Sequence, residues 1–391
     1  MTGNGLRGRS GRDGPFTGVR LVEVGGLPAS YCGKLLGDLG ADVVKVEPPG
    51  GDATRTLPPT WPAGAQPGHS LPFLYLNTSK RSVTLNLRDR AGVDLFRRLV
   101  AASDVLVEAF PPGELDAMDL GHAMLSKDHP SLIMASISGF GQTGPRKDCP
   151  ASAMVAFALS GLMWWTGPAD QPPLRLPGAL IDNICGLQAT AAIGMALYDR
   201  DITGAGRHID ISMQEALTSF TSLTGVAKFL DDGVQQKRGA SLHAVGTPTG
   251  LYPCKDGAIS LAVGRPHMWA PLARWVAEVT GHDAILDPIF EDRYQRLQSV
   301  ELIEKWVTDL ISRFTMEEAF HEGQRRGLVM APLNACANMV DHLQLTEREF
   351  FAPVAHPEGT LRYPGAPYKL SETPWEIARR APDPGEHNAE V

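Results

Sequence analysis

One acidic side chain stands where a carboxylate can do chemistry. Asp182 lies within the stretch Pro177–Gly186 and precedes an apolar segment, about 184–198, that is rich in alanine and glycine. We predict a helix there, whose small residues let another backbone approach closely. A carboxylate at the start of such a helix can cap the free N–H groups of the first turn. Alternatively, a carboxylate delivered into a crowded interior can have a chemical role rather than a capping role.

The capping use lacks one part of its usual sequence pattern. No glutamate or glutamine stands three residues after Asp182, where Cys185 is found, so the reciprocal capping box is missing. The residues of this stretch leave both uses open. The elements that surround Asp182 must decide between them.

Composition excludes several classes of protein. The chain has 391 residues, 43% of them hydrophobic and 20% charged, and a net charge of −8, which disfavours a nucleic-acid partner. The five cysteines are far apart and form no CxxC pair, so neither a disulfide framework nor a metal site is indicated. No run of 18 apolar residues occurs, so we expect no membrane span and a cytoplasmic protein.

The N-terminal half alternates strands with helices. Strands are predicted at 18–24, 41–47, 83–87, 104–108 and 132–138, and helices at 29–39 and 90–102. This order indicates an open α/β sheet of parallel strands. The last strand runs into a loop with three glycines, Gly139–Pro145, where a parallel sheet usually holds its ligand. The first turn, Gly25–Gly26, lacks the GxGxxG spacing, which weakens the alternative of an NAD-dependent dehydrogenase.

Two adjacent cations precede one of these strands. Lys80 and Arg81 stand at the entrance of the strand predicted at 83–87. They can pair with the phosphates of a ligand, or they can belong to a solvated turn.

Motifs spread over most of the chain occur in a fixed order: Gly40–Glu47, Asn77 with Lys80–Ser82, Ser138–Pro145, Leu159–Met163, Gly204–Glu215, His356–Pro357, Pro364–Pro367 and Gly385–Asn388. In this order they resemble the class III CoA-transferase family, also described as the carnitine-dehydratase/bile-acid-inducible type. That family includes formyl-CoA transferases and 2-methylacyl-CoA racemases.

The resemblance implies an α/β fold with a large Rossmann-like lobe, a smaller α+β lobe and two chains interlocked as a dimer. We therefore expect a disordered tail over 1–15, the large lobe over 16–200, a connecting helix over 201–225, the small lobe over 226–330 and a C-terminal segment, 331–391, that returns to the large lobe. In the small lobe the residues themselves predict a strand pair, 250–254 and 258–263, and helices over 269–280 and 300–314. A homodimer is expected, and a heteromer with a related chain is the alternative.

The resemblance also implies a reaction. Asp182 matches the aspartate that attacks an acyl-CoA thioester, so the implied substrates are an acyl-CoA and a free carboxylic acid, with coenzyme A as the group transferred and no metal. The positions that match CoA-binding parts of the family are Arg55, Lys80, Arg81, Phe110, Gly141 and Gln142.

Some positions depart from the family pattern. Leu27 begins a segment where the family often has Gln-Ala-Gly-Pro, Ala109 replaces an asparagine, Ala117 replaces an arginine, and the loop before Gly246 keeps only that glycine. These departures motivate a second hypothesis, a non-catalytic or half-active subunit of a heteromer. An acyl-CoA racemase is a weaker alternative, because the segment that would carry its histidine is Ala151–Ala153 and has no titratable group.

Overall fold

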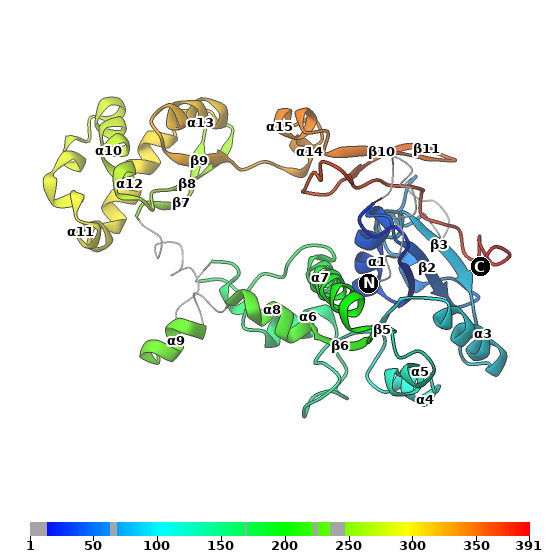
Figure 1. Cartoon of the computed structure of the whole chain (residues 1–391). Coiled ribbons are helices and arrows are strands. Elements are labelled where there is room, and N and C mark those ends of the chain that lie inside the picture. The colour runs from blue at the N-terminus through cyan, green and yellow to red at the C-terminus, as the bar shows by residue number, and fades with distance from the viewer. Residues whose placement is uncertain (1–13, 63–68, 169, 222–225, 235–246) are drawn as a thin grey trace. The chain divides into compact units, whose positions relative to one another are not determined.

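The computed structural model describes residues 14–62, 69–168, 170–221, 226–234 and 247–391 (Figure 1). Contacts divide the chain into two compact units. The first contains the chain up to Trp164, then Leu174–Ala227 and Glu347–Val391, and the second contains Trp165–Pro173 and Lys228–Thr346. Most of the tail expected at 1–15 lies outside the described residues.

The first unit is built on a six-stranded sheet in the order β3-β2-β1-β4-β5-β6. All neighbouring strands are parallel, so the predicted parallel α/β lobe is confirmed. Its strands read as short apolar runs because both faces of the sheet are covered. They are β1 (Arg20–Gly25), β2 (Asp42–Glu47), β3 (Lys80–Thr84), β4 (Val105–Ala109), β5 (Ile133–Ser138) and β6 (Arg207–Ser212).

The connecting helix expected over 201–225 is wrong for much of its length. Helix α7 (Leu180–Thr203) ends at Gly204, whose φ of 74° closes the helix in the left-handed conformation that suits glycine. The chain then returns as β6 beside β5, followed by the short helix α8 (Met213–Thr218). The sequence of β6 alternates polar and apolar residues, a strand period that the expectation of a helix overlooked.

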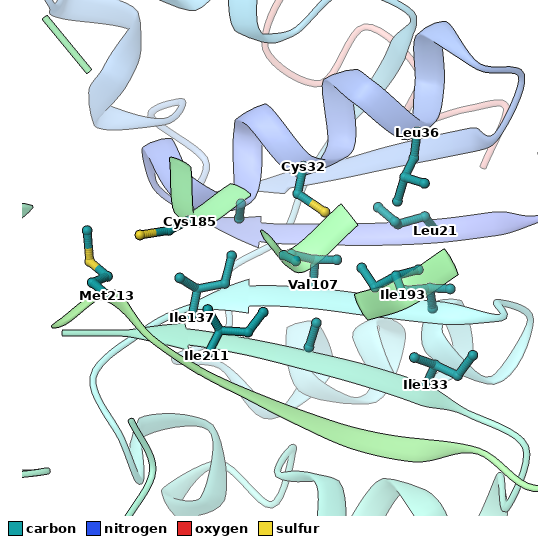
Figure 2. Close-up of a cluster of buried hydrophobic side chains, with 14 of the residues drawn as sticks. Leu21, Cys32, Leu36, Val107, Ile133, Ile137, Cys185, Ile193, Ile211 and Met213 are labelled. Atoms are coloured by element: carbon teal, nitrogen blue, oxygen red, sulfur yellow. The ribbon is translucent and has the colours of Figure 1, made fainter. Parts of the chain in front are cut away.

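Helices cover both faces of the sheet. Helices α1 (Leu27–Asp38) and α7 pack side by side on one face, drawn in blue and green in Figure 1. Their side chains, including Cys32, Leu36 and Ile193, meet strand residues such as Leu21 and Val107 in one buried cluster (Figure 2). The other face packs on α3 (Arg90–Ala101), α4 (Glu114–Ala117) and α5 (His122–Asp128).

Helix α7 is the central helix of this unit and is longer than predicted. Gly186 lets it touch α1: a Cβ there would lie 2.7 Å from the carbonyl oxygen of Pro28. Among the described helices, α7 alone is long and apolar enough to span a membrane by length and composition, a test that a core helix also passes. Its contacts with α1, β5 and β6 place it in the core of the unit.

The C-terminal residues return to the first unit and cover the edge of its sheet. The hairpin β10 (Phe351–His356) and β11 (Gly359–Pro364) comes first. Beyond it, the backbone N–H of Ser82 donates to Nδ1 of His387 (3.2 Å), and that of Thr84 donates to Oδ1 of Asn388 (2.9 Å). These contacts occupy donors of the edge strand β3 that would otherwise be free to pair with another chain.

The second unit has its own sheet and core. The predicted strand pair is confirmed as the antiparallel β7 (Thr249–Cys254) and β8 (Gly257–Ala262), to which β9 (Val329–Pro332) is added. Helices α10 (Pro266–Thr280), α12 (Val300–Ile311) and α13 (Met316–Arg325) pack on it.

The remaining described α-helices, from either unit, are α2 (Leu71–Leu76), α6 (Ala153–Leu159), α9 (Ala227–Asp232), α11 (Arg293–Gln298), α14 (Cys336–Met339) and α15 (Leu343–Glu347).

Candidate active site

A cavity of about 440 Å³ lies at the carboxyl ends of β4 and β5 in the first unit. Ligands of parallel α/β sheets bind at this edge. Its walls come from the start of α1, the segments after both strands, and Met213: Pro28, Ala109–Pro112, Ile137–Gly139, Lys147–Ala151 and Met213. We call it the main cavity. It is largely apolar, with Lys147 and Asp148 as charged groups.

Asp182 stands in the first turn of α7. The cap position of this helix is Ala179, which makes no side-chain hydrogen bond, so Asp182 is not the capping residue, one of the two uses that the sequence left open. Its carboxyl group interacts with its own backbone N–H, which lowers its pKa, but burial outweighs this and raises the pKa to about 6. At pH 7 about nine-tenths of the group is therefore ionised. It is a half-buried carboxylate held at a helix start without serving as its cap.

Packing places the start of α7 beside the main cavity. Gly186, one turn after Asp182 and on the same side of the helix, touches Pro28, which lines the cavity. Cys185 packs in the same cluster as Met213, another lining residue, and Figure 2 shows both at one end of that cluster. The Gly186 contact and the shared cluster thus place the second turn of α7 near the walls of the cavity.

Three of the sequence-predicted binding residues lie at the same edge of the sheet. Phe110 lines the main cavity. Gly141 has a φ of 85°, which turns the chain after β5, and the next backbone N–H, from Gln142, donates to both carboxylate oxygens of Asp210 at 3.0 Å. Gln142 lines a second, smaller cavity rather than the main one.

Arg55, Lys80 and Arg81 lie elsewhere, each bound to a carboxylate of the chain. Lys80 is fully buried, and its Nζ is 2.6 Å from Oε2 of Glu23, so it belongs neither to a solvated turn nor to an exposed phosphate site in this structure. Arg55 is also buried and forms a two-point hydrogen bond with Glu47. Arg81 pairs with Asp42 at the first residue of β2, the opposite end of the strands from the main cavity.

Lys80 and Arg55 are part of a larger buried set of charges, which we call the ion-pair cluster. Lys45 bridges two carboxylates, with its Nζ 3.0 Å from Glu23 and 2.9 Å from Asp52. Burial acts against the charge of Lys45, but Glu23 and Asp52 outweigh it and raise the pKa of Lys45 above its ordinary value. The ion-pair cluster consists of Glu23, Lys45, Glu47, Asp52, Arg55 and Lys80.

The smaller cavity, of about 240 Å³, contains titratable groups that sequence reasoning missed. Glu108 is buried near the end of β4, and Ser136, His122 and His208 line the same cavity. Burial raises the pKa of Glu108 to about 6. The available signal was a glutamate that ends the apolar run Val105–Val107, a position where burial is expected.

The positions that depart from the family pattern lie in different parts of the chain. Leu27 is the first residue of α1, Ala109 ends β4 in the wall of the main cavity, and Ala117 ends α4. Gly246 and the loop before it lie outside the described residues. In the part of the chain that the structure describes, no group of three or more His, Cys, Asp or Glu is placed to hold a metal ion.

Together, the parallel sheet and the cavity at its carboxyl edge are the arrangement of an α/β enzyme. The sequence matches CoA-transferase family III over residues 16–388, and the chain belongs to that family. The resemblance predicted from its motifs is confirmed.

Individual relatives agree with this assignment. The chain is 34% identical to a succinyl-CoA:(R)-benzylsuccinate CoA-transferase subunit of Thauera aromatica, over 96% of this chain and 93% of that protein. It is also 34% identical to the beta subunit of a succinyl-CoA–L-malate CoA-transferase of Chloroflexus aurantiacus, with the same coverage. A crystal structure of a CAIB/BAIF family protein from Brucella suis superposes with a TM-score of 0.86 at 28% identity, covering 97% of this chain and 98% of that one. The chain is thus similar to CoA-transferases along nearly its whole length.

Proposed function

We propose that this chain transfers CoA from an acyl-CoA to a free carboxylic acid, with Asp182 as the nucleophile. One observation carries the proposal: in a family III CoA-transferase, Asp182 is half-buried at the start of a helix whose Gly186 packs on Pro28 of the main cavity, and no cation is among the causes of its pKa shift. A carboxylate held by a cation is stabilised and less reactive, whereas this one is destabilised by burial and still ionised at pH 7.

The first half of the proposed reaction loads CoA onto the enzyme. A carboxylate oxygen of Asp182 attacks the thioester carbon, the C–S bond breaks, and CoA leaves as a thiolate from a mixed anhydride. The thiolate then attacks the Asp182 carbonyl carbon of that anhydride. This gives an aspartyl-CoA thioester and releases the donor acid as a carboxylate.

The second half reverses these steps with the acceptor. The acceptor carboxylate attacks the aspartyl thioester, which again releases the thiolate and forms a mixed anhydride. The thiolate attacks the acceptor's acyl carbon, which forms the new thioester and regenerates the Asp182 carboxylate. The positive end of the α7 helix dipole would stabilise the oxyanions that form at each attack.

The main cavity suits the reacting part of this substrate. Its apolar walls, including Phe110, Ile137 and Met213, fit an acyl group and an uncharged thioester arm, and Lys147 supplies a cation for an anionic group. Both relatives named above use succinyl-CoA as the donor according to their names. Succinyl-CoA is therefore the first donor to test.

The experiment traps the covalent intermediate. The protein is incubated with a panel of acyl-CoAs that includes succinyl-CoA, quenched with hydroxylamine or borohydride, and mapped by mass spectrometry. We expect a modification on the peptide that contains Asp182, lost in Asp182→Ala and retained in Asp201→Ala, an exposed aspartate of the same helix. Activity that survives Asp182→Ala would overturn the assignment of the nucleophile, and the absence of any adduct or CoA binding would favour the non-catalytic subunit.

The exposed side of α7 supports a further part of the proposal, a dimer. Leu187, Met195, Tyr198 and Ile202 follow helical spacing along one face, and Tyr198 and Ile202 are 72% and 70% exposed. We expect a second chain to cover this face. The names of both CoA-transferase relatives refer to subunits, so a related chain is an alternative partner to a second copy.

Light scattering of the purified chain distinguishes these states. A homodimer should dissociate when Ile202 is changed to glutamate and persist when its neighbour Asp201 is changed to asparagine. A wild-type monomer that dimerises only with a related chain would favour the heteromer.

A further inference from the structure

Glu108 is tied directly to the wall of the main cavity. It stands near the end of β4 and is only 4% exposed, and its Oε2 accepts a hydrogen bond from the backbone N–H of Phe110 at 2.7 Å. The main cavity is lined by Ala109–Pro112. The smaller cavity is lined by Glu108 and again by Pro111, which therefore borders both. The segment is thus a partition between the two cavities, and the carboxylate of Glu108 holds it from the side of the smaller cavity.

A chain of hydrogen bonds continues from this carboxylate to two imidazoles. Ser136 of β5 bonds the side chain of Glu108, and its Oγ is 2.9 Å from Nε2 of His208. The ring of His208 stacks on that of His122, with centroids 4.9 Å apart and an interplanar angle of 10°. Because Ser136 has a single hydroxyl hydrogen, it can donate to Glu108 only while Nε2 of His208 donates to it.

The protonation of this chain is set by its surroundings. Burial raises the pKa of Glu108, and the nearby carboxylates Asp116 and Glu114 of α4 raise it further. Burial lowers the pKa of both His122 and His208, partly offset at His208 by Asp210 and Asp116. The ionised carboxylate makes the stronger bond to the Phe110 N–H, because charge-assisted hydrogen bonds are stronger than neutral ones.

We propose that Glu108 is a positioning residue: it fixes the Ala109–Pro112 segment in the shape that receives CoA, and the Ser136–His208–His122 chain determines how firmly it does so. The proposal rests on the proposed function, since it takes a CoA thioester as the ligand of the main cavity. Glu108 contacts the backbone of the cavity wall rather than the reacting atoms, so its effect should fall on CoA affinity and leave the chemical step unchanged.

Two substitutions separate positioning from packing. Glu108→Gln keeps an oxygen that can accept from the Phe110 N–H but no longer titrates, whereas Glu108→Ala removes the acceptor. The matched control is Asp128→Asn, an exposed position on α5. Hydrogen–deuterium exchange of a peptide around Phe110 reports the bond directly, because Pro111 and Pro112 contribute no amide signal.

The expected results differ between the variants. Glu108→Ala should lose roughly tenfold protection at Phe110 and bind CoA about tenfold more weakly by calorimetry, with kcat within about twofold of wild type. Glu108→Gln imitates the protonated carboxyl, so at pH 7 it should bind CoA about as weakly as wild type does below about pH 6, though less weakly than Glu108→Ala, and its affinity should not change across this pH range.

Distinct outcomes would overturn the two proposals. Unchanged Phe110 exchange and CoA affinity in Glu108→Ala would overturn the positioning role and leave the proposed function standing. A Glu108→Gln variant as defective as Glu108→Ala, with an equally lowered unfolding temperature, would show that Glu108 acts through packing. Wild-type protein that binds no CoA would overturn the proposed function and the role of Glu108 in CoA binding together, while Phe110 exchange still decides whether Glu108 fixes the segment.

Discussion

Two regions of the first unit bury ionisable groups in opposite ways. In the ion-pair cluster, Glu23, Lys45 and Lys80 are all fully buried and lie within 3.0 Å of an opposite charge. Glu108 is also buried and Asp182 is half-buried, but no cation is among the causes of their pKa shifts, and the burial that each has raises its pKa to about 6. Opposed charges stabilise one arrangement of the chain, whereas an unopposed carboxylate near its pKa can change its protonation or react.

The same comparison explains the different fates of the predicted binding residues. Burial would raise the pKa of Glu47, but the hydrogen bonds and charge of Arg55 outweigh it and lower that pKa. Arg55 is therefore used in holding Glu47, and its guanidinium also donates to the carbonyl oxygen of Pro382 in the C-terminal segment (3.0 Å). We infer that the basic residues of the ion-pair cluster shape the sheet edge and that the reacting carboxylate depends on the other region.

The largest expected effect of a substitution in either region is the loss of activity at Asp182. Asp182→Asn should lower CoA transfer on the order of 10³-fold or more, because the amide cannot form the anhydride. The measurement is the steady-state rate with succinyl-CoA and a panel of acceptor acids. Asp201→Asn, on the same helix but exposed, is the control and should retain wild-type turnover.

The largest expected loss of stability lies in the other region. Glu23→Gln leaves the ammonium groups of Lys45 and Lys80 without their shared carboxylate, which should lower the free energy of unfolding by about 3–5 kcal/mol. Asp42→Asn is the matched control, since its partly exposed pair with Arg81 should contribute less than about 1 kcal/mol. Urea denaturation measures both, and equal small losses would show that the cluster is not the rigid support inferred here.

The sequence predicted the sheet well where strands are buried on both faces. The apolar runs of β1, β2, β4 and β5 are distinctive because helices cover both sides. Strand β6 was not predicted. It is an edge strand with polar residues in alternate positions, and this alternation was overlooked because a connecting helix was expected there. The helix that carries Asp182 was predicted, but its true start was not, because Ala179 caps it without any side-chain bond.

The site was only partly visible in the sequence. Asp182 and Phe110 were recognised from the motifs around them, and the structure places both at the carboxyl edge of the sheet, Phe110 in the cavity wall and Asp182 one turn before the Gly186 contact. Lys80 was predicted to bind CoA because it matches a motif of the family. Its burial depends on Glu23, a residue on another strand, and on Gly33, where any Cβ would collide with that carboxylate. Contacts between distant segments of this kind leave no local pattern in the sequence.

The raised pKa of Asp182 should also make the stability of the protein depend on pH. Its pKa in the folded protein, about 6, lies above its ordinary value of 3.8, so the fold favours the neutral form. Stability from this group is therefore full below about pH 4 and is lost as the pH rises towards 6. Asp182→Asn should raise the free energy of unfolding by about 2 kcal/mol at pH 8 and change it little at pH 4. A destabilised variant at pH 8 would mean that Asp182 is held by a favourable partner, which contradicts the comparison.

The smallest expected effect is a difference in pH dependence that distinguishes the role of Asp182 from that of Glu108. Asp182 must be ionised to attack, so at saturating acyl-CoA the rate of adduct formation should be roughly tenfold lower at pH 5 than on the plateau above pH 7. Below saturation, the Glu108–Phe110 bond also weakens as Glu108 is protonated, so the apparent second-order rate should fall more steeply with acid. Rapid quenching at several pH values measures both profiles. Glu108→Gln should make the subsaturating profile as shallow as the saturating one, and a variant whose two profiles still differ would show that Asp182 and Glu108 do not divide the roles of reaction and positioning in this way.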